Sequence, residues 1–279
     1  MRVRRSVLYM PSSNARALEK AKTIPADSVI FDLEDAVAPE AKEPARRQAC
    51  EAVQSGAYGG RELTIRCNGL DTPWGEADLR AAAAAAPAAV VVPKVSGVEH
   101  LRAVAALIGD TPIWAMVETP VAVFDIRAIT GFDQVEVLVL GTNDLAKELR
   151  AALLPGRAAL LPHLATALLG AREAGKVILD GVWNDVRDLA GFEAECRQGA
   201  ELGFDGKTLI HPSQVEVANR VWAPEQAQVE HARRVIDAFE QATAAGQGVV
   251  TVDGRMVENL HVDNARRTLA VAEAIAAAG

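Results

Sequence analysis

The chain has 279 residues, half of them hydrophobic, which is enough for one α/β barrel or for two smaller domains. Its formal net charge of -8 at pH 7 argues against a nucleic-acid-binding protein, whose surface would be basic. Its 3 cysteines form no CxxC pair, and no apolar run is long enough to span a membrane. We therefore expect a cytoplasmic protein that binds neither nucleic acid nor a membrane.

Short apolar runs alternate with longer, alanine-rich and charged segments along residues 1–222. The runs predict eight strands, each followed by a segment with helical spacing, at 6–10, 28–35, 62–68, 89–94, 113–119, 135–142, 176–182 and 206–212. Eight such units predict a (β/α)8 TIM barrel, with parallel strands inside and helices outside. A doubly wound open sheet is the alternative, but no GxGxxG or GxxxxGK[ST] motif supports it.

The pattern changes in residues 223–279. A helix is expected from about 224 to 244 and a final helix from about 264 to 278. Between them, alternation around Asp253-Gly254 predicts a hairpin turn. We interpret 223–279 as a C-terminal lid or oligomerisation extension attached to a barrel catalytic domain of residues 1–222.

Polar residues close the predicted strands: Asp32, Glu34, Asp35, Arg66, Asn68, Lys94, Glu118, Asn143, Asp144, Asp180, Lys207 and His211. In a barrel the carboxyl ends of the strands converge on one face, and that face carries the chemistry. The convergence therefore predicts an active site there. For His211 the expectation is a structural hydrogen bond, because no pair of histidines has metal-ligand spacing.

Glu118 and Asp144 form the leading pair. They end consecutive strands, which lie about 5 Å apart in a barrel, and two unpaired carboxylates at that distance would repel each other. A divalent cation removes the conflict, and oxygen ligands favour Mg²⁺, with Mn²⁺ as the alternative. In the competing interpretation, Asp144 caps a helix that starts near Leu145, and Glu118 pairs with Arg66 or Lys94.

Arg66 is a candidate for holding a substrate carboxylate through two parallel hydrogen bonds. An equally ordinary role is that of counter-ion to Glu34 or Asp35. Strand alternation would point Asp32 and Glu34 to one side and Asp35 to the other. We therefore expect at least one of these carboxylates to support Arg66 or Lys94. Covalent catalysis is the weaker hypothesis, because the serines lack a GxSxG elbow.

Several stretches together resemble one enzyme family: RSVLYMPSSN, FDLEDAVAPEAK, IRCNG, VVVPKV, MVETP, LVLGTNDLAKEL, LDGVWND, GFDGKTLIHPSQV and DGRMVENLHVDNARRTL. They occur in order over nearly the whole chain, and the combination of GTNDLAKEL with GFDGKTLIHPSQ is specific. The chain resembles the citrate lyase β-subunit-like CoA-ester lyases of the HpcH/HpaI aldolase group.

This resemblance implies a barrel that assembles as a homotrimer or homohexamer, with the extension covering a neighbouring subunit's site. It implies Mg²⁺ bound by Glu118 and Asp144, and Arg66 on the oxygens of an α-keto or hydroxy acid. Asn143 is expected to orient the site and contact the substrate. The implied reaction is cleavage or formation of a 3-hydroxy-dicarboxylyl-CoA thioester, such as malyl-CoA, β-methylmalyl-CoA, citramalyl-CoA or citryl-CoA.

One position departs from the family pattern. Such lyases commonly carry an acid–base aspartate in the C-terminal arm, within a stretch like GKMIDRP, whereas this chain has GRMVENL. Glu258 takes the aspartate's place, keeps the carboxylate and adds one methylene. A displacement on the order of 1 Å can cost about a hundredfold in rate. Two alternatives to a CoA-ester lyase stay open. One is a malyl-CoA thioesterase, in which water attacks the same bound thioester, and the other is an acyl-lyase subunit of a larger complex that acts on an acyl-carrier protein.

Overall fold

The computed structural model describes residues 2–244, 246 and 249–278. The chain forms two compact units, Arg4–Asn219 and Arg220–Gly279, the latter taken with the first residues of the chain. The division falls within helix α10 (Val215–Val221), close to the predicted boundary after residue 222. Each unit has a hydrophobic core of its own.

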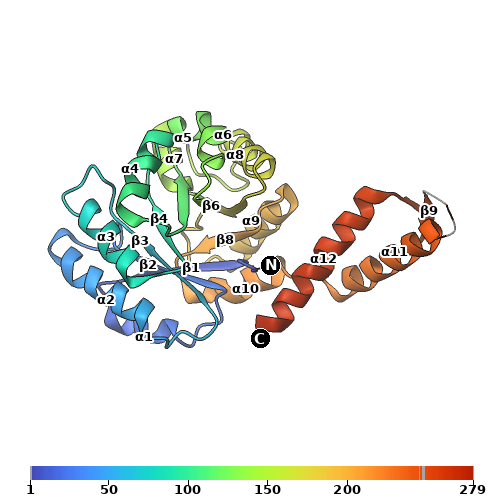
Figure 1. Ribbon diagram of the computed structural model, residues 1–279, viewed down its shortest axis with the longest axis horizontal. Coiled ribbons are helices and arrows are strands. Elements are labelled where there is room, and N and C mark those ends of the chain that lie inside the picture. The colour runs from blue at the N-terminus through green and yellow to red at the C-terminus, as the bar shows by residue number, and fades with distance from the viewer. Residues whose placement is uncertain (1, 245, 247–248, 279) are drawn as a thin grey trace. The chain divides into compact units, whose positions relative to one another are not determined.

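The first unit is a closed barrel of parallel strands, and helices surround it (Figure 1). This arrangement confirms the predicted TIM barrel. The strands follow one another around the barrel in chain order, and the last pairs with the first. They are β1 (Ser6–Pro11), β2 (Ser28–Asp32), β3 (Glu62–Arg66), β4 (Ala89–Val92), β5 (Ile113–Val117), β6 (Val135–Leu140), β7 (Val177–Asp180) and β8 (Gly206–Leu209).

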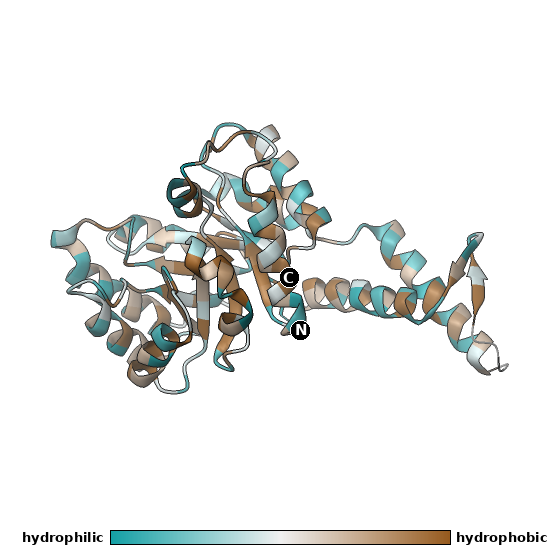
Figure 2. Ribbon diagram, turned by 90° about the horizontal axis from the view of Figure 1, so that it is seen from above, coloured by the Kyte–Doolittle hydropathy of each residue, from teal (hydrophilic) through white to brown (hydrophobic). Residues whose placement is uncertain are grey.

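The strands are rich in β-branched and other apolar residues because they are covered on both faces. Every residue of β2, β4 and β5 is buried. Inside the barrel, Val7, Ile30, Val91, Trp114 and Val139 belong to one apolar cluster. Figure 2 shows these strands as hydrophobic and the outer helices as mixed. Because the interior of the barrel is apolar, charged side chains lie at the ends of its strands.

Helices of the first unit are α1 (Ala15–Ala21), α2 (Lys42–Gln54), α3 (Gly75–Ala85), α4 (Val98–Ile108), α5 (Pro120–Phe124), α6 (Ile126–Thr130), α7 (Thr142–Leu149), α8 (Leu161–Glu173), α9 (Leu189–Leu202) and α10, with 3-10 turns η1 (Pro39–Ala41) and η2 (Pro212–Gln214). The side chain of Thr119 accepts the Ala122 N–H at 3.2 Å, and Pro120 follows at the first helical position. This cap starts α5 immediately after Glu118. None of the helices in the described ranges combines the length and apolar character needed to cross a membrane.

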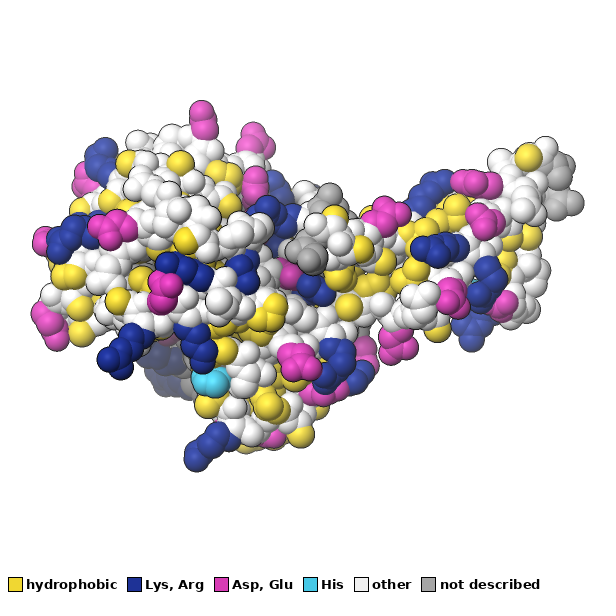
Figure 3. Space-filling view, turned by 90° about the horizontal axis from the view of Figure 1, so that it is seen from below, with side chains coloured by type: hydrophobic (Ala, Val, Ile, Leu, Met, Phe, Trp, Pro, Cys, Tyr) yellow, Lys and Arg dark blue, Asp and Glu magenta, His cyan; other side chains and the backbone are white. Residues whose placement is uncertain are grey.

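The second unit pairs α11 (Gln226–Ala244) with α12 (Asn259–Ala278) and carries an antiparallel hairpin of β9 (Val250–Val252) and β10 (Arg255–Val257). Asp253 and Gly254 have φ of 50° and 76°, as a two-residue type I′ turn requires, so the predicted turn is confirmed. Figure 3 shows apolar side chains among the charged ones of this unit. Met256 and Leu260 are exposed there, which suits the predicted role as an extension that binds another surface.

The expected start of the last helix near residue 264 is wrong, because α12 begins at Asn259. The main-chain N–H of Glu258 donates to His261 Nδ1 at 3.1 Å, and its carbonyl accepts the His261 N–H at 2.9 Å. These two bonds give hydrogen-bond partners to main-chain groups at the start of α12. The helix can therefore begin at Asn259, in a segment that the sequence pattern did not predict to be helical.

Candidate active site

A cavity of about 420 Å³ opens where the carboxyl ends of the barrel strands meet. Among its acidic and basic lining residues are Asp32, Asp35, Glu118 and Asp144 against Arg66. The full lining is Tyr9, Pro11, Asp32, Asp35, Ala36, Arg66, Met116, Glu118, Leu140, Gly141, Thr142, Asn143, Asp144, Val182, Thr208 and Ile210. The excess of carboxylates makes the cavity attractive to a cation.

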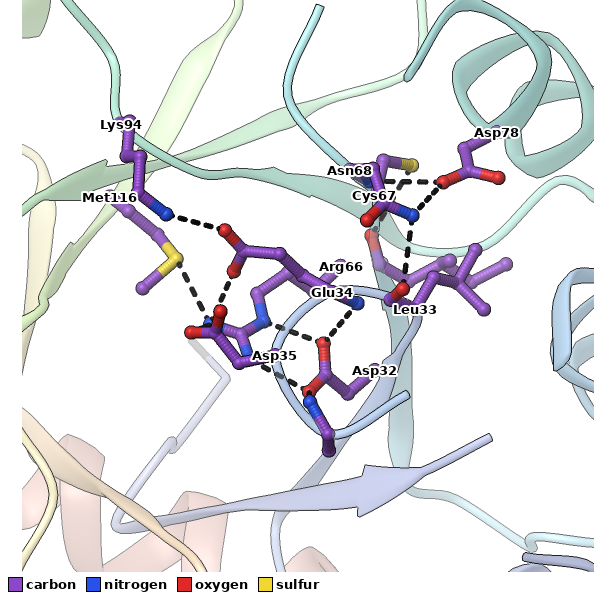
Figure 4. A network of polar contacts seen from close by, with 12 residues as sticks. Asp32, Leu33, Glu34, Asp35, Arg66, Cys67, Asn68, Asp78, Lys94 and Met116 are labelled. Carbon is purple, nitrogen blue, oxygen red and sulfur yellow. Dashed lines mark hydrogen bonds and ion pairs between the residues drawn. The ribbon is translucent and has the colours of Figure 1, made fainter. Parts of the chain in front are cut away.

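Arg66 is fixed at one edge of its guanidinium by Asp32 (Figure 4). The two residues are register partners at the ends of β3 and β2, and Asp32 accepts from Nε and Nη2 at 2.7 Å each. The guanidinium carbon also lies 4.8 Å from the centre of the Tyr9 ring. A guanidinium has five N–H groups, so a substrate oxygen would use those of Nη1 and Nη2 that Asp32 leaves.

Glu34 links Arg66 to Lys94. Its Oε1 accepts from Lys94 Nζ at 2.7 Å, and its Oε2 lies 2.8 Å from Arg66 Nη1 as an ion pair without hydrogen-bond alignment. Burial raises the pKa of Glu34, and Arg66 and Lys94 offset only part of that effect. Burial acts in the same direction on Asp32, but there the Arg66 guanidinium prevails and holds the pKa below its usual value.

Asp35 does not point away from Arg66 as strand alternation predicted. Its carboxylate lies 3.7 Å from Arg66 Nη1, although the side chain is 65% exposed. The prediction is wrong because β2 ends at Asp32, so Asp35 stands in a turn where the two-residue period no longer applies. Asp32, Glu34 and Asp35 therefore all face the same guanidinium.

Lys94, in the loop after β4, lies close to both Glu118 and Asp144. Its main-chain N–H donates to Glu118 Oε1 at 2.7 Å, and its ammonium nitrogen lies 4.0 Å from Asp144 Oδ2. Lys94 has φ of 47°, a left-handed conformation that costs free energy for a residue other than glycine. The strained backbone of Lys94 lies beside Glu118, and it directs the Lys94 N–H toward the Glu118 carboxylate.

Glu118 is almost fully buried, with 1% exposure, and its carboxylate accepts a hydrogen bond from the main-chain N–H of Lys94. Burial, reinforced by the nearby Glu34 carboxylate, raises the pKa of Glu118 to about 7. A Cβ at position 141 would lie 2.3 Å from Glu118 Oε2, so only glycine leaves this carboxylate its place. Within the described residues Glu118 forms no ion pair with Arg66 or Lys94, contrary to the competing interpretation.

Asp144 lies in the first turn of helix α7, which begins at Thr142 after an N-cap at Gly141, and within the described residues its side chain caps no helix. The interpretation of Asp144 as the cap of a helix starting near Leu145 is therefore wrong. Its carboxylate is 31% exposed and lines the same cavity as Glu118. Position in the first helical turn also favours a negative charge there, through the helix dipole.

The donor set of Glu118 and Asp144 fits a hard divalent cation. Two carboxylates from neighbouring strand ends line one cavity, and burial raises the pKa of Glu118 although Lys94 and Arg66 offset part of the effect. In the described part of the chain no group of three or more His, Cys, Asp and Glu side chains is placed to hold a metal. A site of two carboxylates leaves several positions to water and substrate oxygens, as Mg²⁺ prefers.

Asn143 lines the cavity and is tied to the next loop. Its Nδ2 donates to Asn184 Oδ1 at 3.0 Å, and Asn184 Nδ2 donates back to Asn143 Oδ1 at 2.8 Å. This reciprocal pair joins α7 to the segment after β7, so it holds the cavity wall beside Asp144.

Asp180 and Lys207 do not line the cavity, contrary to the expectation that all polar strand ends share its chemistry. Asp180 binds Lys207 at 2.9 Å and Arg157 at 2.6 Å, and Lys207 binds Glu195 of α9 at 2.8 Å. These side chains point toward α9 rather than into the cavity, and they form a buried structural network. Sequence reasoning missed Arg157 and Glu195, because nothing in a helix or loop segment marks a buried charge.

Two further predicted residues, His211 and Glu258, do not line the cavity. His211 Nδ1 lies 2.7 Å from Ser213 Oγ and accepts the Ser213 N–H, a structural role as expected. Glu258 belongs to the second unit, where its side chain is exposed directly before α12. Tyr9 was not among the predicted site residues, although its place two residues after Val7 in β1 puts both on the inner face of the barrel.

Comparisons with known proteins match nearly the whole chain. The family model HpcH/HpaI aldolase/citrate lyase matches residues 5–212, and a model for C-C bond lyases of the TIM-barrel fold matches 158–276. A (3S)-malyl-CoA thioesterase of Cereibacter sphaeroides is 52% identical, over 98% of this chain and 96% of its own length. The citrate lyase subunit beta of Escherichia coli is 36% identical, over 98% and 94%.

Among solved structures, CitE of Mycobacterium tuberculosis, crystallised with magnesium, acetoacetate and coenzyme A, superposes with a TM-score of 0.80 at 28% identity. The match covers 96% of this chain and 97% of that one. A citrate lyase beta subunit from the same organism, complexed with oxaloacetate and magnesium, matches 80% of this chain at 29% identity.

Proposed function

Because the chain belongs to the HpcH/HpaI aldolase/citrate lyase family, we propose that it is a Mg²⁺-dependent enzyme for a 3-hydroxy-dicarboxylyl-CoA thioester. Family membership confirms the resemblance drawn from the sequence motifs, and the second matching model is one of carbon–carbon bond lyases. Malyl-CoA is the first candidate substrate. The observation that carries the proposal is the cavity that brings Glu118, Asp144 and Arg66 together.

In this proposal Glu118 and Asp144 hold Mg²⁺, or Mn²⁺ in its place. When bound, the metal supplies Lewis-acid stabilisation for negative charge on substrate oxygens. Arg66 binds the substrate carboxylate through the N–H groups that Asp32 leaves free, and Glu34 with Asp32 keeps the guanidinium in place. Lys94 orients Glu118 through its main-chain N–H.

The lyase reaction is a retro-Claisen cleavage. A base takes the proton of the substrate hydroxyl, the C2–C3 bond of the malyl group breaks, and glyoxylate leaves as the aldehyde. The electron pair of that bond moves into the thioester as an enolate, which becomes acetyl-CoA when an acid protonates its carbon. We assign that acid to Glu258, supplied by the extension of a neighbouring subunit in a homotrimer or homohexamer.

Hydrolysis of the same thioester is the second candidate, and the sequence comparison favours it. Four relatives from Cereibacter sphaeroides strains, 50% to 52% identical over nearly the full chain, are (3S)-malyl-CoA thioesterases. Hydrolysis would use the same substrate contacts through Arg66 and the metal, with water attacking the thioester carbon. The exchange of the usual aspartate for Glu258 is the sequence difference that bears on this choice.

An acyl-lyase subunit that acts on an acyl-carrier protein is the third possibility, supported by the 36% identity to citrate lyase subunit beta. We place it below the others because the thioesterase relatives are closer in sequence. The cytoplasmic location stays a prediction, with which the free thiols of Cys50, Cys67 and Cys196 agree.

The experiment is incubation of the purified protein with malyl-CoA and Mg²⁺, followed by mass spectrometry of the products. Acetyl-CoA with glyoxylate identifies a lyase, whereas free CoA with malate identifies a thioesterase. A parallel reaction in EDTA tests the metal requirement. Absence of both product pairs, with malyl-CoA and with a panel of related thioesters, would refute the proposal for free CoA esters. Activity restored by an acylated carrier protein would support the third possibility.

A further inference from the structure

Tyr9 lines the cavity, and the proposed function gives its hydroxyl group no role. The residue is half-buried near the end of β1, packs against the apolar cluster of the barrel, and lines the cavity with Glu118 and Arg66. Within the described residues the hydroxyl takes part in no hydrogen bond, and it is not one of the polar atoms sealed from solvent without a partner. It therefore remains in contact with the cavity and is free to bind a ligand.

The chain's other tyrosine shows the ordinary alternative. Tyr58 is buried, and its hydroxyl donates to the Leu18 carbonyl at 3.0 Å. The Tyr9 hydroxyl has no such protein partner within the described residues, so its hydrogen-bonding capacity is available to a ligand in the cavity. Tyr9 thus has the environment of a ligand-binding group, whereas Tyr58 has that of a structural one.

The Tyr9 ring is held in a defined position. Its face stacks on the Arg66 guanidinium at 4.8 Å, and Arg66 is itself fixed by Asp32. Burial raises the pKa of the Tyr9 hydroxyl; Arg66 opposes this, while the Asp32 and Glu118 carboxylates add to it. The phenol therefore keeps its proton and acts as a neutral hydrogen-bond donor.

Two other side-chain donors that line the cavity, Thr208 and Asn143, already have partners. The Thr208 hydroxyl donates to the Asp180 carbonyl at 3.1 Å, and the Asn143 amide donates to Asn184. Arg66 faces three carboxylates. Tyr9 stands on β1, across the barrel from β5, which carries Glu118 at its end. We take the hydroxy-acid end of the substrate to lie against Glu118 and Asp144, with its acyl group extending toward β1.

We propose that the Tyr9 hydroxyl donates a hydrogen bond to the acyl oxygen of the bound thioester. This oxygen gains negative charge in both candidate reactions, as the enolate oxygen in cleavage and as the tetrahedral oxyanion in hydrolysis. A fixed donor aimed at such an atom stabilises the transition state more than the ground state. The inference rests on the proposed function and names the residue that serves the acyl end.

Tyr9→Phe tests the assignment, because it removes the hydroxyl and keeps the ring that stacks on Arg66. We expect kcat with the productive thioester to fall by about a hundredfold to a thousandfold, with KM little changed. Tyr58→Phe is the matched control and should leave kcat within about threefold of wild type. Binding of Mg²⁺ with pyruvate, which lacks a thioester oxygen, should be the same in Tyr9→Phe and wild type.

Two outcomes would overturn the assignment alone while the proposed function stands. One is a Tyr9→Phe enzyme as active as wild type, and the other is an equal weakening of pyruvate binding, which would mean that Tyr9 acts by placing Arg66. If the wild-type protein turns over no thioester, the proposed function fails and the assignment falls with it. Thermal unfolding of the variant shows that any loss of rate does not come from loss of fold.

Discussion

The main-chain N–H of Lys94 donates a 2.7 Å hydrogen bond to Glu118 Oε1, and Lys94 adopts φ of 47° in the same loop. A strained residue other than glycine therefore places one of the two leading carboxylates. The opposite side of Glu118 is closed by Gly141, whose missing side chain leaves room for Oε2. Glu118 is thus fixed by the main chain from two strands, β4 and β6, that flank its own.

Gly141→Ala should displace Glu118 without unfolding the barrel. The added Cβ would meet Glu118 Cβ at 2.4 Å and Oε2 at 2.3 Å, so the carboxylate has to move. We expect the affinity for Mg²⁺, measured by calorimetry, to fall by about tenfold to a hundredfold, as when support of a metal ligand is lost. Gly60→Ala is the control, because nothing lies within 4 Å of a Cβ there. Equal affinities in the two variants would contradict the packing argument.

Glu118→Gln and Asp144→Asn should each abolish Mg²⁺-dependent turnover and leave the fold intact. Each exchange removes the charge of a proposed metal ligand but keeps the size and shape of the side chain, so we expect turnover to fall by at least about a hundredfold. Glu148→Gln is the control: it removes an exposed carboxylate from the same helix as Asp144. Circular dichroism and a Mg²⁺ titration of the rate check the prediction. Variants with full activity would refute the metal assignment.

The stability of the metal-free protein should fall as the pH rises from about 4.5 to about 7. Glu118 has a folded pKa of about 7 against an ordinary 4.5, so the fold favours the protonated form, and this contribution is lost as the carboxyl ionises. The shift corresponds to on the order of 3 kcal/mol. Glu118→Gln should flatten this dependence in denaturant unfolding with EDTA. An unchanged slope in the variant would show that other groups control it.

Lys207→Met should destabilise the barrel strongly although Lys207 lies outside the cavity. Lys207 is fully buried between Asp180 and Glu195, and its removal leaves two buried carboxylates with Arg157 alone. Breaking such a buried network costs about 3–5 kcal/mol. Lys20→Met, at an exposed site, should change the free energy of unfolding by no more than about 0.5 kcal/mol. Similar midpoints in urea for both variants would contradict the structural role of the network.

Glu258→Gln should lower turnover and be rescued by a second inactive variant if the extension serves a neighbouring subunit. Co-expression with Glu118→Gln would combine an intact barrel with an intact extension at about a quarter of the sites, given random mixing in a closed ring. Activity of the purified mixture, compared with each variant alone, measures this. A mixture as inactive as its components would assign Glu258 to its own subunit or to no catalytic role.

The barrel could be predicted because its strands are buried on both faces and stand out as short apolar runs, such as the one that ends at Leu140. Glu118 and Asp144 could be proposed because they follow such runs. What the sequence could not show is the direction of a polar side chain at a strand end. Glu118 turns into the cavity and Asp180 turns toward a helix, and no hydrophobic alternation distinguishes them.

Asp35 and the start of α12 were mispredicted for a related reason. Both depend on local hydrogen bonds in segments where periodicity stops, the turn after Asp32 and the capping of Glu258 by His261. Tyr9 escaped notice because an aromatic residue in a strand is ordinary core material until its hydroxyl is seen without a partner.

The pairing of Asp32 with Arg66 has a consequence for how the barrel folds. The two residues stand opposite each other in the β2–β3 register, so a slip of one position would leave a carboxylate and a guanidinium without their partners in a mostly apolar interior. Correct alignment of β2 with β3 therefore also pairs Arg66, the arginine that we propose binds the substrate, with Asp32. The Asp32–Arg66 ion pair therefore also raises the free energy of barrels in which β2 and β3 are misaligned, and it does so without any ligand.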